Sequence, residues 1–276
     1  MNLLNKLKVF DDQIYGKVST YGDQSAEAKI RTVNAKKIYS SYLNEICNYH
    51  SVPVMDREVR IFLKNLPKNA VVLDVGGCWG WHWRHINLYR PDIKIVILDF
   101  VRHNLIHAKN LHSKNINKNI FLVNGDAKKL EFENDTFDAV WSVQVIQHIK
   151  DYKKVYQEVH RVLKKKGKFF DYNLNNSILR KAISLLFKKK YIIQGHHAVG
   201  GFYLRRSNQL QLIFLEKIFK NKCKQRYSEI LFLPEIKLKI TGRENSIIGK
   251  IDSFFSSGFY ILKFIARQKS LHIVKK

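Results

Sequence analysis

Residues 71–83, with the sequence VVLDVGGCWGWHW, restrict the fold more than any other part of the chain. The apolar residues predict a buried strand that ends at Asp74, followed by a tight turn and a stretch with helical spacing. The turn contains Gly76, Gly77 and Gly80. Such a loop often holds a nucleotide-type ligand, because small residues let backbone N–H groups approach it at a helix N-terminus. By itself the pattern also fits a plain turn between a strand and a helix.

Strands and helices alternate after this segment. Apolar runs predict strands at 69–75, 93–98, 119–123, 137–143 and 168–172. Helices are expected near 102–111 and 152–163, because apolar residues recur there at helical spacing. Repeated alternation of this kind predicts an α/β fold with a parallel, doubly wound sheet.

The N-terminal part has a helical pattern only. Residues 26–49 and 56–66 carry apolar residues at helical spacing. We therefore expect residues 1–66 to form an N-terminal helical cap on a domain that comprises residues 67–276.

The C-terminal part is less regular. Residues 174–207 are expected to form an insertion that covers the substrate, with an amphipathic helix at 178–193 and a loop at 194–201. A helix is expected at 208–219. Two late strands, 226–233 and 259–266, suit an antiparallel hairpin on the edge of the sheet.

Charge is distributed unevenly along the chain, whose formal net charge is +26. Residues 161–276 hold 26 Lys and Arg against 6 Asp and Glu, whereas residues 1–160 hold 23 against 17. The basic part would attract phosphate-bearing partners such as nucleic acid, or the surface of an anionic membrane. Lysines that only decorate solvated faces would give the same composition.

The expected location is cytoplasmic, with peripheral membrane contact as an added alternative. Three cysteines lack metal-site spacing, and neither a secretory signal nor an apolar run of membrane-spanning length is present. Residues 178–193 form an apolar face bordered by lysines, which would suit docking on an anionic membrane. The same stripe also suits an ordinary core face.

Five short motifs follow one another between residues 71 and 172. They are residues 74–80 (DVGGCWG), Asp99 at a strand end, residues 125–127 (GDA), residues 137–138 (FD) and residues 158–167 (EVHRVLKKKG). Their order resembles the class I S-adenosylmethionine-dependent methyltransferases, and in particular the small-molecule branch with a methyltransferase type 11 domain. The resemblance implies a Rossmann-like, mostly parallel seven-stranded sheet and S-adenosyl-L-methionine as the cofactor.

The resemblance also assigns cofactor contacts. Asp99 would accept hydrogen bonds from both ribose hydroxyls, because an ionised carboxylate only accepts. Asp126 would contact the adenine amino group, with the Ala127 amide beside it, although an Asp at this place also fits a helix cap. The other expected contacts are Asp74, Gly76, Gly77, Cys78 and Gly80 in the loop, together with Phe100 and Ser142.

Residue 78 departs from the family pattern, which reads Asp-x-Gly-x-Gly-x-Gly. Cys78 stands at the middle glycine, and Gly77 lies next to it. If position 78 needs a positive φ, a cysteine there is strained by about 1 kcal/mol or more. Otherwise Gly77 absorbs the turn, or the cofactor sits slightly differently.

Methyl transfer from a sulfonium is an in-line displacement, so positioning supplies much of the rate. A base is needed only for a protonated nucleophile. Candidates lie at the strand ends and are His148, Asp171 and Tyr172, with packing or capping as the alternative for His148. The pair at residues 196–197 lies in the loop expected over the substrate. No third ligand is suggested by spacing, so no metal is expected.

The expected function is methyl transfer to an oxygen or nitrogen atom of a small-molecule, glycan or lipid-linked metabolite. An RNA methyltransferase is one alternative, favoured by the basic C-terminal part although no RNA-binding module is recognisable. A catalytically inactive binding protein with the same fold is another, favoured by Cys78. The acceptor, the methylated atom and the oligomeric state stay open.

Overall fold

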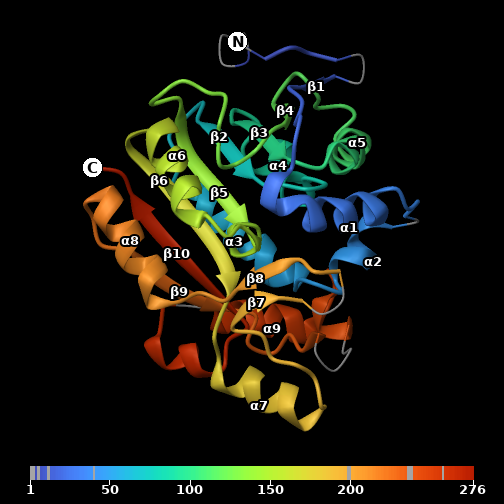
Figure 1. Cartoon of the computed structure of the whole chain (residues 1–276), viewed down its shortest axis with the longest axis vertical. Coiled ribbons are helices and arrows are strands. Elements are labelled where there is room, and N and C mark those ends of the chain that lie inside the picture. Colours follow the sequence, from blue (N-terminus) through green and yellow to red (C-terminus); the bar gives the residue numbers. More distant parts are fainter. Residues whose placement is uncertain are drawn as a thin grey trace.

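The computed structural model describes residues 4, 7–10, 13–39, 41–197, 200–234, 239–256 and 258–276, with the backbone alone for 239 and 240. Within these residues an eight-stranded sheet has the order β1-β4-β3-β2-β5-β6-β10-β9 (Figure 1). Its strands are β1 (Ile14–Tyr15), β2 (Val71–Val75), β3 (Lys94–Asp99), β4 (Ile120–Asn124), β5 (Phe137–Val143), β6 (Leu163–Leu174), β9 (Lys224–Ser228) and β10 (Gln268–Val274). A separate hairpin pairs β7 (Gln194–His196) with β8 (Tyr203–Arg205).

The predicted sheet type is confirmed. The strands β1 to β6 pair in parallel, whereas β10 runs antiparallel to both β6 and β9 at one edge. The eighth strand is β1, which comes from the expected helical cap and pairs with β4.

Helices cover both faces of the sheet (Figure 1). The α-helices are α1 (Ser25–Ala35), α2 (Tyr42–Ile46), α3 (Val52–Lys64), α4 (Ile86–Tyr89), α5 (Arg102–Leu111), α6 (Tyr152–Val162), α7 (Ile178–Leu186), α8 (Gln209–Phe219) and α9 (Ile247–Phe255). Short 3-10 helices are η2 (Gly22–Gln24), η3 (Trp81–Trp83), η4 (Ile146–His148), η6 (Lys239–Gly242) and η7 (Tyr260–Phe264).

Two hydrophobic clusters form the core, one on each face of the sheet. In β2, Leu73 packs with α6 and α8. The preceding residue, Val72, packs with α3, α4 and α5. Successive strand residues point to opposite faces, so a strand buried on both faces is apolar throughout. This explains why residues 71–73 of β2 and 95–98 of β3 are recognisable from sequence as continuous apolar runs.

The prediction of a strand at 259–266 is wrong. Most of this segment is the 3-10 helix η7, whose end is closed by hydrogen bonds from Ile265 and Ala266 to the Leu262 carbonyl. The strand is β10, which begins at Gln268 and pairs on both sides. Its polar residues Gln268 and Ser270 are buried, so the sequence does not show the apolar run that marks a strand.

Other predicted element boundaries also differ from the observed ones. The helix expected at 26–49 is two helices, α1 and α2, and the helix expected at 178–193 ends at Leu186. The loop expected at 194–201 begins with β7, while residues 198 and 199 lie outside the described part of the chain.

The sheet topology determines where a ligand can bind. From β2 the chain continues to β3 and β4 on one side, and it then crosses to β5 on the other side. The connections therefore diverge at the carboxyl end of β2, which leaves a crevice at this switch point.

Candidate active site

A cavity of about 530 Å³ lies at the carboxyl ends of the central strands, a volume typical of ligand sites. One part, which we call the glycine-loop half, is lined by residues at the ends of β2 and β3 and by residues that follow β2, β3 and β4. They include Asp74, Gly76, Gly77, Cys78, Asp99, Phe100, Asp126 and Ala127. The other part, the histidine half, includes His50, His82, Gln144, Gln147, His148, His197, Phe202, Leu204 and Arg267.

The glycine loop is tied to the neighbouring strand by its backbone. The N–H groups of Gly76 and Gly77 donate to the Leu98 carbonyl, at 2.7 and 3.2 Å. The next N–H, of Cys78, donates to Asp99 Oδ2 at 3.0 Å. The turn after β2 is therefore fixed by β3.

Cys78 has the positive φ that strains a cysteine at this position. Its φ is +52°, and Gly76 and Gly80 have φ of +70° and +67°, whereas Gly77 does not adopt a positive φ. Gly77 is instead required by space, because a Cβ there would lie 2.3 Å from Asp74 Oδ2. Gly77 therefore does not absorb the turn in place of residue 78.

Replacing Cys78 with glycine is expected to raise the free energy of unfolding by about 0.5–1 kcal/mol, because glycine accepts a positive φ without strain. Cofactor affinity should be equal or higher. Cys78→Ala is the matched control, since alanine removes the thiol but keeps the strain. Denaturant unfolding of the three proteins measures the effect, and a Gly variant no more stable than the Ala variant would contradict it.

Asp74 and Asp99 are both buried beside the loop. Asp74 Oδ2 accepts a hydrogen bond from Trp83 Nε1 at 2.7 Å. The Asp99 Oδ1 atom accepts from the Val101 N–H at 2.8 Å and from Asn104 Nδ2 at 3.3 Å. These bonds fix the orientation of both carboxyl groups at the edge of the cavity.

Burial raises the pKa of Asp74 to about 7 and that of Asp99 to about 6, and the hydrogen bonds only partly oppose this. The charge of Asp99 also raises the pKa of Asp74. Two buried carboxyl groups near one cavity favour a ligand that brings hydroxyl donors and positive charge. The ribose, the ammonium and the sulfonium of S-adenosylmethionine supply these groups, so the residues fit this cofactor.

Most of the remaining predicted cofactor residues line the cavity. Phe100 lines it and makes an edge contact with Tyr21, with ring centroids 5.7 Å apart. Asp126 and Ala127 line it too, and Asp126 Oδ1 also accepts from the Lys128 N–H at 2.8 Å, as a residue in a turn does. Gly80 is not among the lining residues, although its φ shapes the loop.

Arg31 is a cavity residue that was not predicted from the sequence. This residue of α1 lines the glycine-loop half, and its Nε donates to Glu27 Oε1 at 2.7 Å. Glu27 keeps the pKa of Arg31 above its ordinary value although burial opposes this. An arginine on a polar helix looks like a solvated residue, so only the packing of α1 over the cavity reveals it.

His148 lines the histidine half, and its tautomer follows from its contacts. Its Nδ1 lies 2.7 Å from the Tyr203 carbonyl oxygen, which can only accept, so Nδ1 carries the proton. Its Nε2 lies 3.2 Å from Gln147 Nε2 and accepts from it. Burial lowers the pKa of His148 to about 4, so the ring is neutral at pH 7.

His82 was also missed. It is 8% exposed and stacks on Trp81, with ring centroids 4.1 Å apart. Neither ring nitrogen has a hydrogen-bond partner among the described residues, and burial holds its pKa well below the ordinary value. A buried neutral imidazole with unpaired nitrogen atoms beside a cavity is a candidate for contact with a polar ligand.

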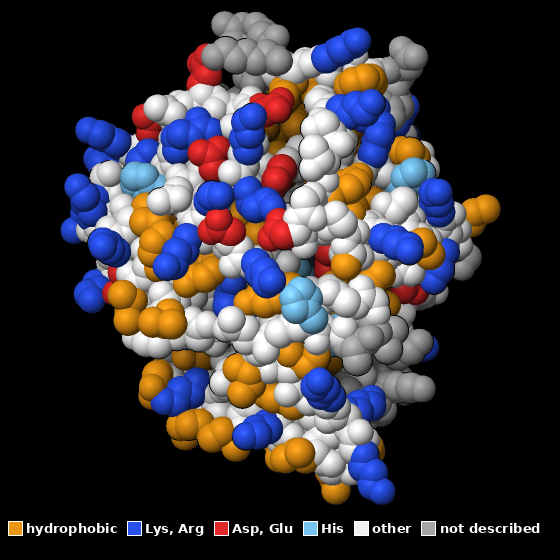
Figure 2. Space-filling model, viewed as in Figure 1, with side chains coloured by type: hydrophobic (Ala, Val, Ile, Leu, Met, Phe, Trp, Pro, Cys, Tyr) orange, Lys and Arg blue, Asp and Glu red, His pale blue; other side chains and the backbone are white. Residues whose placement is uncertain are grey.

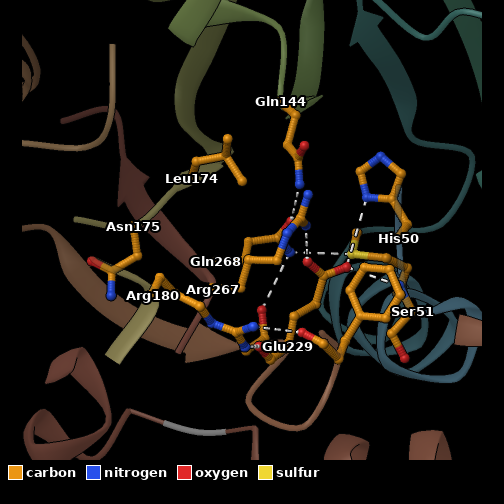
Figure 3. Close-up of polar contacts among 12 residues, drawn as sticks. His50, Ser51, Gln144, Leu174, Asn175, Arg180, Glu229, Arg267 and Gln268 are labelled. Carbon is orange, nitrogen blue, oxygen red and sulfur yellow. Dashed lines mark hydrogen bonds and ion pairs between the residues drawn. The ribbon is translucent and has the colours of Figure 1, made fainter. Parts of the chain in front are cut away.

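A buried ion pair lies beneath the histidine half (Figure 3). Glu229 Oε2 accepts from Arg267 Nη1, and Glu229 Oε1 accepts from the Ser51 N–H at 2.9 Å. His50 Nδ1 lies 3.7 Å from the same Oε1. The cluster fixes Arg267 and His50 at the cavity wall.

Three predicted site residues lie inside the sheet and are not among the lining residues of the cavity. Ser142 and Asp171 are fully buried, and Asp171 Oδ2 accepts from the Tyr156 hydroxyl at 2.6 Å. The Tyr172 hydroxyl donates to Glu58 Oε2 at 3.0 Å on the opposite face. Their placement indicates a role in packing and gives no support to contact with a ligand.

The pair at residues 196–197 is divided. His197 lines the cavity and stacks on Phe202, with ring centroids 4.2 Å apart, whereas His196 Nδ1 lies 2.8 Å from the Gly201 carbonyl oxygen. Among the described residues, no three His, Cys, Asp or Glu side chains come together as a metal site.

Comparison with known proteins identifies a methyltransferase domain within the chain. Residues 73–171 match the family model described as "Methyltransferase domain". The chain is similar to the sarcosine/dimethylglycine N-methyltransferase of Aphanothece halophytica, with 29% identity over 45% of this chain and 47% of the relative. It is also similar to the sterol 24-C-methyltransferase of Candida albicans, with 33% identity over 38% of this chain and 28% of the relative. The matches thus span about half or less of these relatives.

Among solved structures, the chain resembles phosphoethanolamine N-methyltransferase 2 of Haemonchus contortus in complex with S-adenosyl-L-methionine. The TM-score is 0.53 and the identity 20%, over 80% of this chain and 52% of that chain. This likeness shows the fold. The family model identifies residues 73–171 as a methyltransferase domain, and the sheet order and the glycine loop are consistent with the class I S-adenosylmethionine-dependent methyltransferases.

Proposed function

We propose that the chain transfers a methyl group from S-adenosylmethionine to an oxygen or nitrogen atom of a small-molecule, glycan or lipid-linked metabolite. One observation carries the proposal. The buried carboxyl group of Asp99 and the glycine loop share a single cavity with polar groups suited to an acceptor, among them His82 and His148. The relatives named above include an N- and a C-methyltransferase, so they support a small-molecule or sterol acceptor without determining the atom.

In the proposed complex the glycine-loop half holds the cofactor. Asp99 accepts from the ribose hydroxyls, and Asp126 and the Ala127 amide meet the adenine. Arg31 binds the carboxylate of the methionine portion, and Asp74 faces its ammonium. When bound, the cofactor supplies a methyl carbon on a positively charged sulfur, and the chain positions the acceptor in line with it.

The histidine half orients the acceptor. The Tyr203 carbonyl holds the Nδ1–H of His148, so the Nε2 lone pair is directed away from that bond. With a pKa of about 4, His148 is a weak base at pH 7. It therefore acts mainly by accepting a hydrogen bond from the nucleophile, which replaces the one from Gln147 Nε2, and His82 adds a second polar contact.

His148→Gln is expected to lower turnover about 10- to 100-fold while leaving cofactor affinity unchanged, because it removes the acceptor nitrogen on the substrate side. Asp171→Asn, which can still accept from Tyr156, should keep turnover within about twofold, since Asp171 is a packing residue. Label transfer from methyl-labelled cofactor measures both. The reverse order of effects would assign the chemistry to Asp171.

The reaction is tested by incubating the protein with methyl-labelled S-adenosylmethionine and fractionated cell extract. We expect label in a small-molecule or lipid fraction, with formation of S-adenosylhomocysteine. Label in nuclease-sensitive material would support the RNA alternative instead. Absence of S-adenosylhomocysteine with every fraction would identify a binding protein without activity.

A further inference from the structure

Large apolar side chains are exposed together at one end of the molecule. They belong to α7, α9, and η7 with the residue before it. The most exposed are Leu186 at 78%, Phe254 at 77%, Ile247 and Phe259 at 74% each, and Ile261 at 72%. Soluble monomers rarely expose a contiguous apolar surface of this kind without a binding role. We call these three segments the apolar end.

Contacts within the chain bring the three segments together. Arg180 of α7 donates to the carbonyls of Glu229, Ile230 and Phe232, while Asp252 of α9 accepts from N–H groups of residues 230–232. Both helices therefore pack on the same short stretch. The Ser177 hydroxyl, before α7, donates to the Phe264 carbonyl of η7 at 2.8 Å.

The two helices are inverted relative to ordinary surface helices. Arg180 is 0% and Asp252 1% exposed, so each helix turns one charged residue inward, where it binds backbone groups, while Lys181 and Lys250 stay exposed. Each then directs leucine, isoleucine or phenylalanine side chains outward. A helix on a water-facing surface has the opposite arrangement. The outward faces are thus suited to an apolar environment.

Charge distinguishes between occupants of this surface. Exposed lysines flank the apolar residues. They include Lys181 on α7, Lys188 and Lys190 after α7, and Lys250 on α9. The only acidic residue in 178–193 and 247–266 is the buried Asp252. Figure 2 shows hydrophobic and basic side chains together at the lower end, where Figure 1 places α7. A second copy of this surface would bring lysines against lysines, whereas anionic lipid headgroups complement them.

We propose that the apolar end docks the protein on an anionic lipid bilayer, with the apolar residues in the interface and the lysines against the headgroups. No helix in the described ranges is long and apolar enough to cross a membrane, so this is contact with one leaflet. The surface adjoins the cavity along the chain, because Leu174 and Arg267 line the cavity and lie next to α7 and η7. The proposal does not depend on methyl transfer.

Vesicle flotation tests the proposal on the full chain, with vesicles of phosphatidylcholine alone and of phosphatidylcholine mixed with phosphatidylglycerol. The protein should float with the mixed vesicles and much less with the neutral ones, and binding should fall as NaCl is raised. Leu186→Ser combined with Phe254→Ser should lower binding at least about tenfold. Leu88→Ser is the matched control, because Leu88 on α4 is 77% exposed and lies outside the surface.

A second variant keeps the apolar residues and changes only charge. Lys188→Glu with Lys190→Glu should remove the preference for phosphatidylglycerol. Titration with S-adenosylmethionine shows whether each variant is folded, and its result is separate from vesicle binding. Wild-type protein that stays in solution with both vesicle types would overturn the proposal. So would a dimer in sedimentation that the Leu186 and Phe254 variant separates, since a second copy would then cover the surface.

Discussion

Asp99→Ala is expected to weaken S-adenosylmethionine binding about a hundredfold. The variant removes two charge-assisted hydrogen bonds to ribose hydroxyls, which together contribute about 3 kcal/mol. It also frees the Cys78 N–H, which Asp99 holds at 3.0 Å, and so loosens the glycine loop. Isothermal titration calorimetry measures the affinity. Asp151→Ala, which changes an exposed carboxylate paired with Lys154, should bind like the wild type.

The pH dependence of binding tests the same residue. Burial raises the pKa of Asp99 to about 6, so its ionised form, which accepts from both hydroxyls, is lost as pH falls. Loss of the ionised Asp99 should therefore decrease affinity roughly tenfold between pH 7 and pH 5. Asp99→Asn should bind weakly and lose this tenfold component, and the pH dependence that stays is that of Asp74, whose pKa burial raises to about 7. A wild-type affinity that does not change, or an Asn variant that binds as tightly, would contradict the assignment.

Glu229→Gln is expected to lower the free energy of unfolding by about 3 kcal/mol, because it leaves the buried Arg267 guanidinium without its counter-charge. Burial alone would raise the pKa of Glu229, but Arg267 and His50 hold it at about 2. Denaturant unfolding at neutral pH measures the loss. The pair of the exposed Lys222 with the half-buried Glu216 offers a control, and Glu216→Gln should cost less than about 1 kcal/mol.

The sign of the pH effect follows from the lowered pKa. An ionised Glu229 stabilises the folded state above the pKa of the unfolded chain, near 4.5, and this contribution is lost as pH falls towards 2. The difference between wild type and Glu229→Gln should therefore shrink over that range. A difference that stays constant from neutral pH to pH 2 would show that the ion pair is not its source.

Much of the fold between β2 and β6 could be predicted, because the sequence patterns of its strands, helices and loops are local. Strand β5 was predicted with the observed bounds, 137–143, and α5 likewise at 102–111. The loop after β2 was recognised from glycines at fixed spacing. Strain at Cys78 could be considered from the sequence because φ at that position depends on the turn itself.

Several cavity residues could not be predicted, because their positions depend on contacts between distant parts of the chain. Arg267 lines the cavity only because β10 lies beside β6, and Arg31 only because α1 packs over the loop. Asp171 looked like a site residue at the end of a strand, yet β6 continues to Leu174 and buries it. The pleat decides which face each side chain takes, and the sequence did not locate the strand end accurately.

Calorimetric titration of folded wild-type protein with S-adenosylmethionine tests the central assignment most directly. We expect saturable binding at one site, with competition by S-adenosylhomocysteine and loss in Asp99→Ala. Absence of binding up to high micromolar cofactor would contradict the account of the cavity and of the reaction.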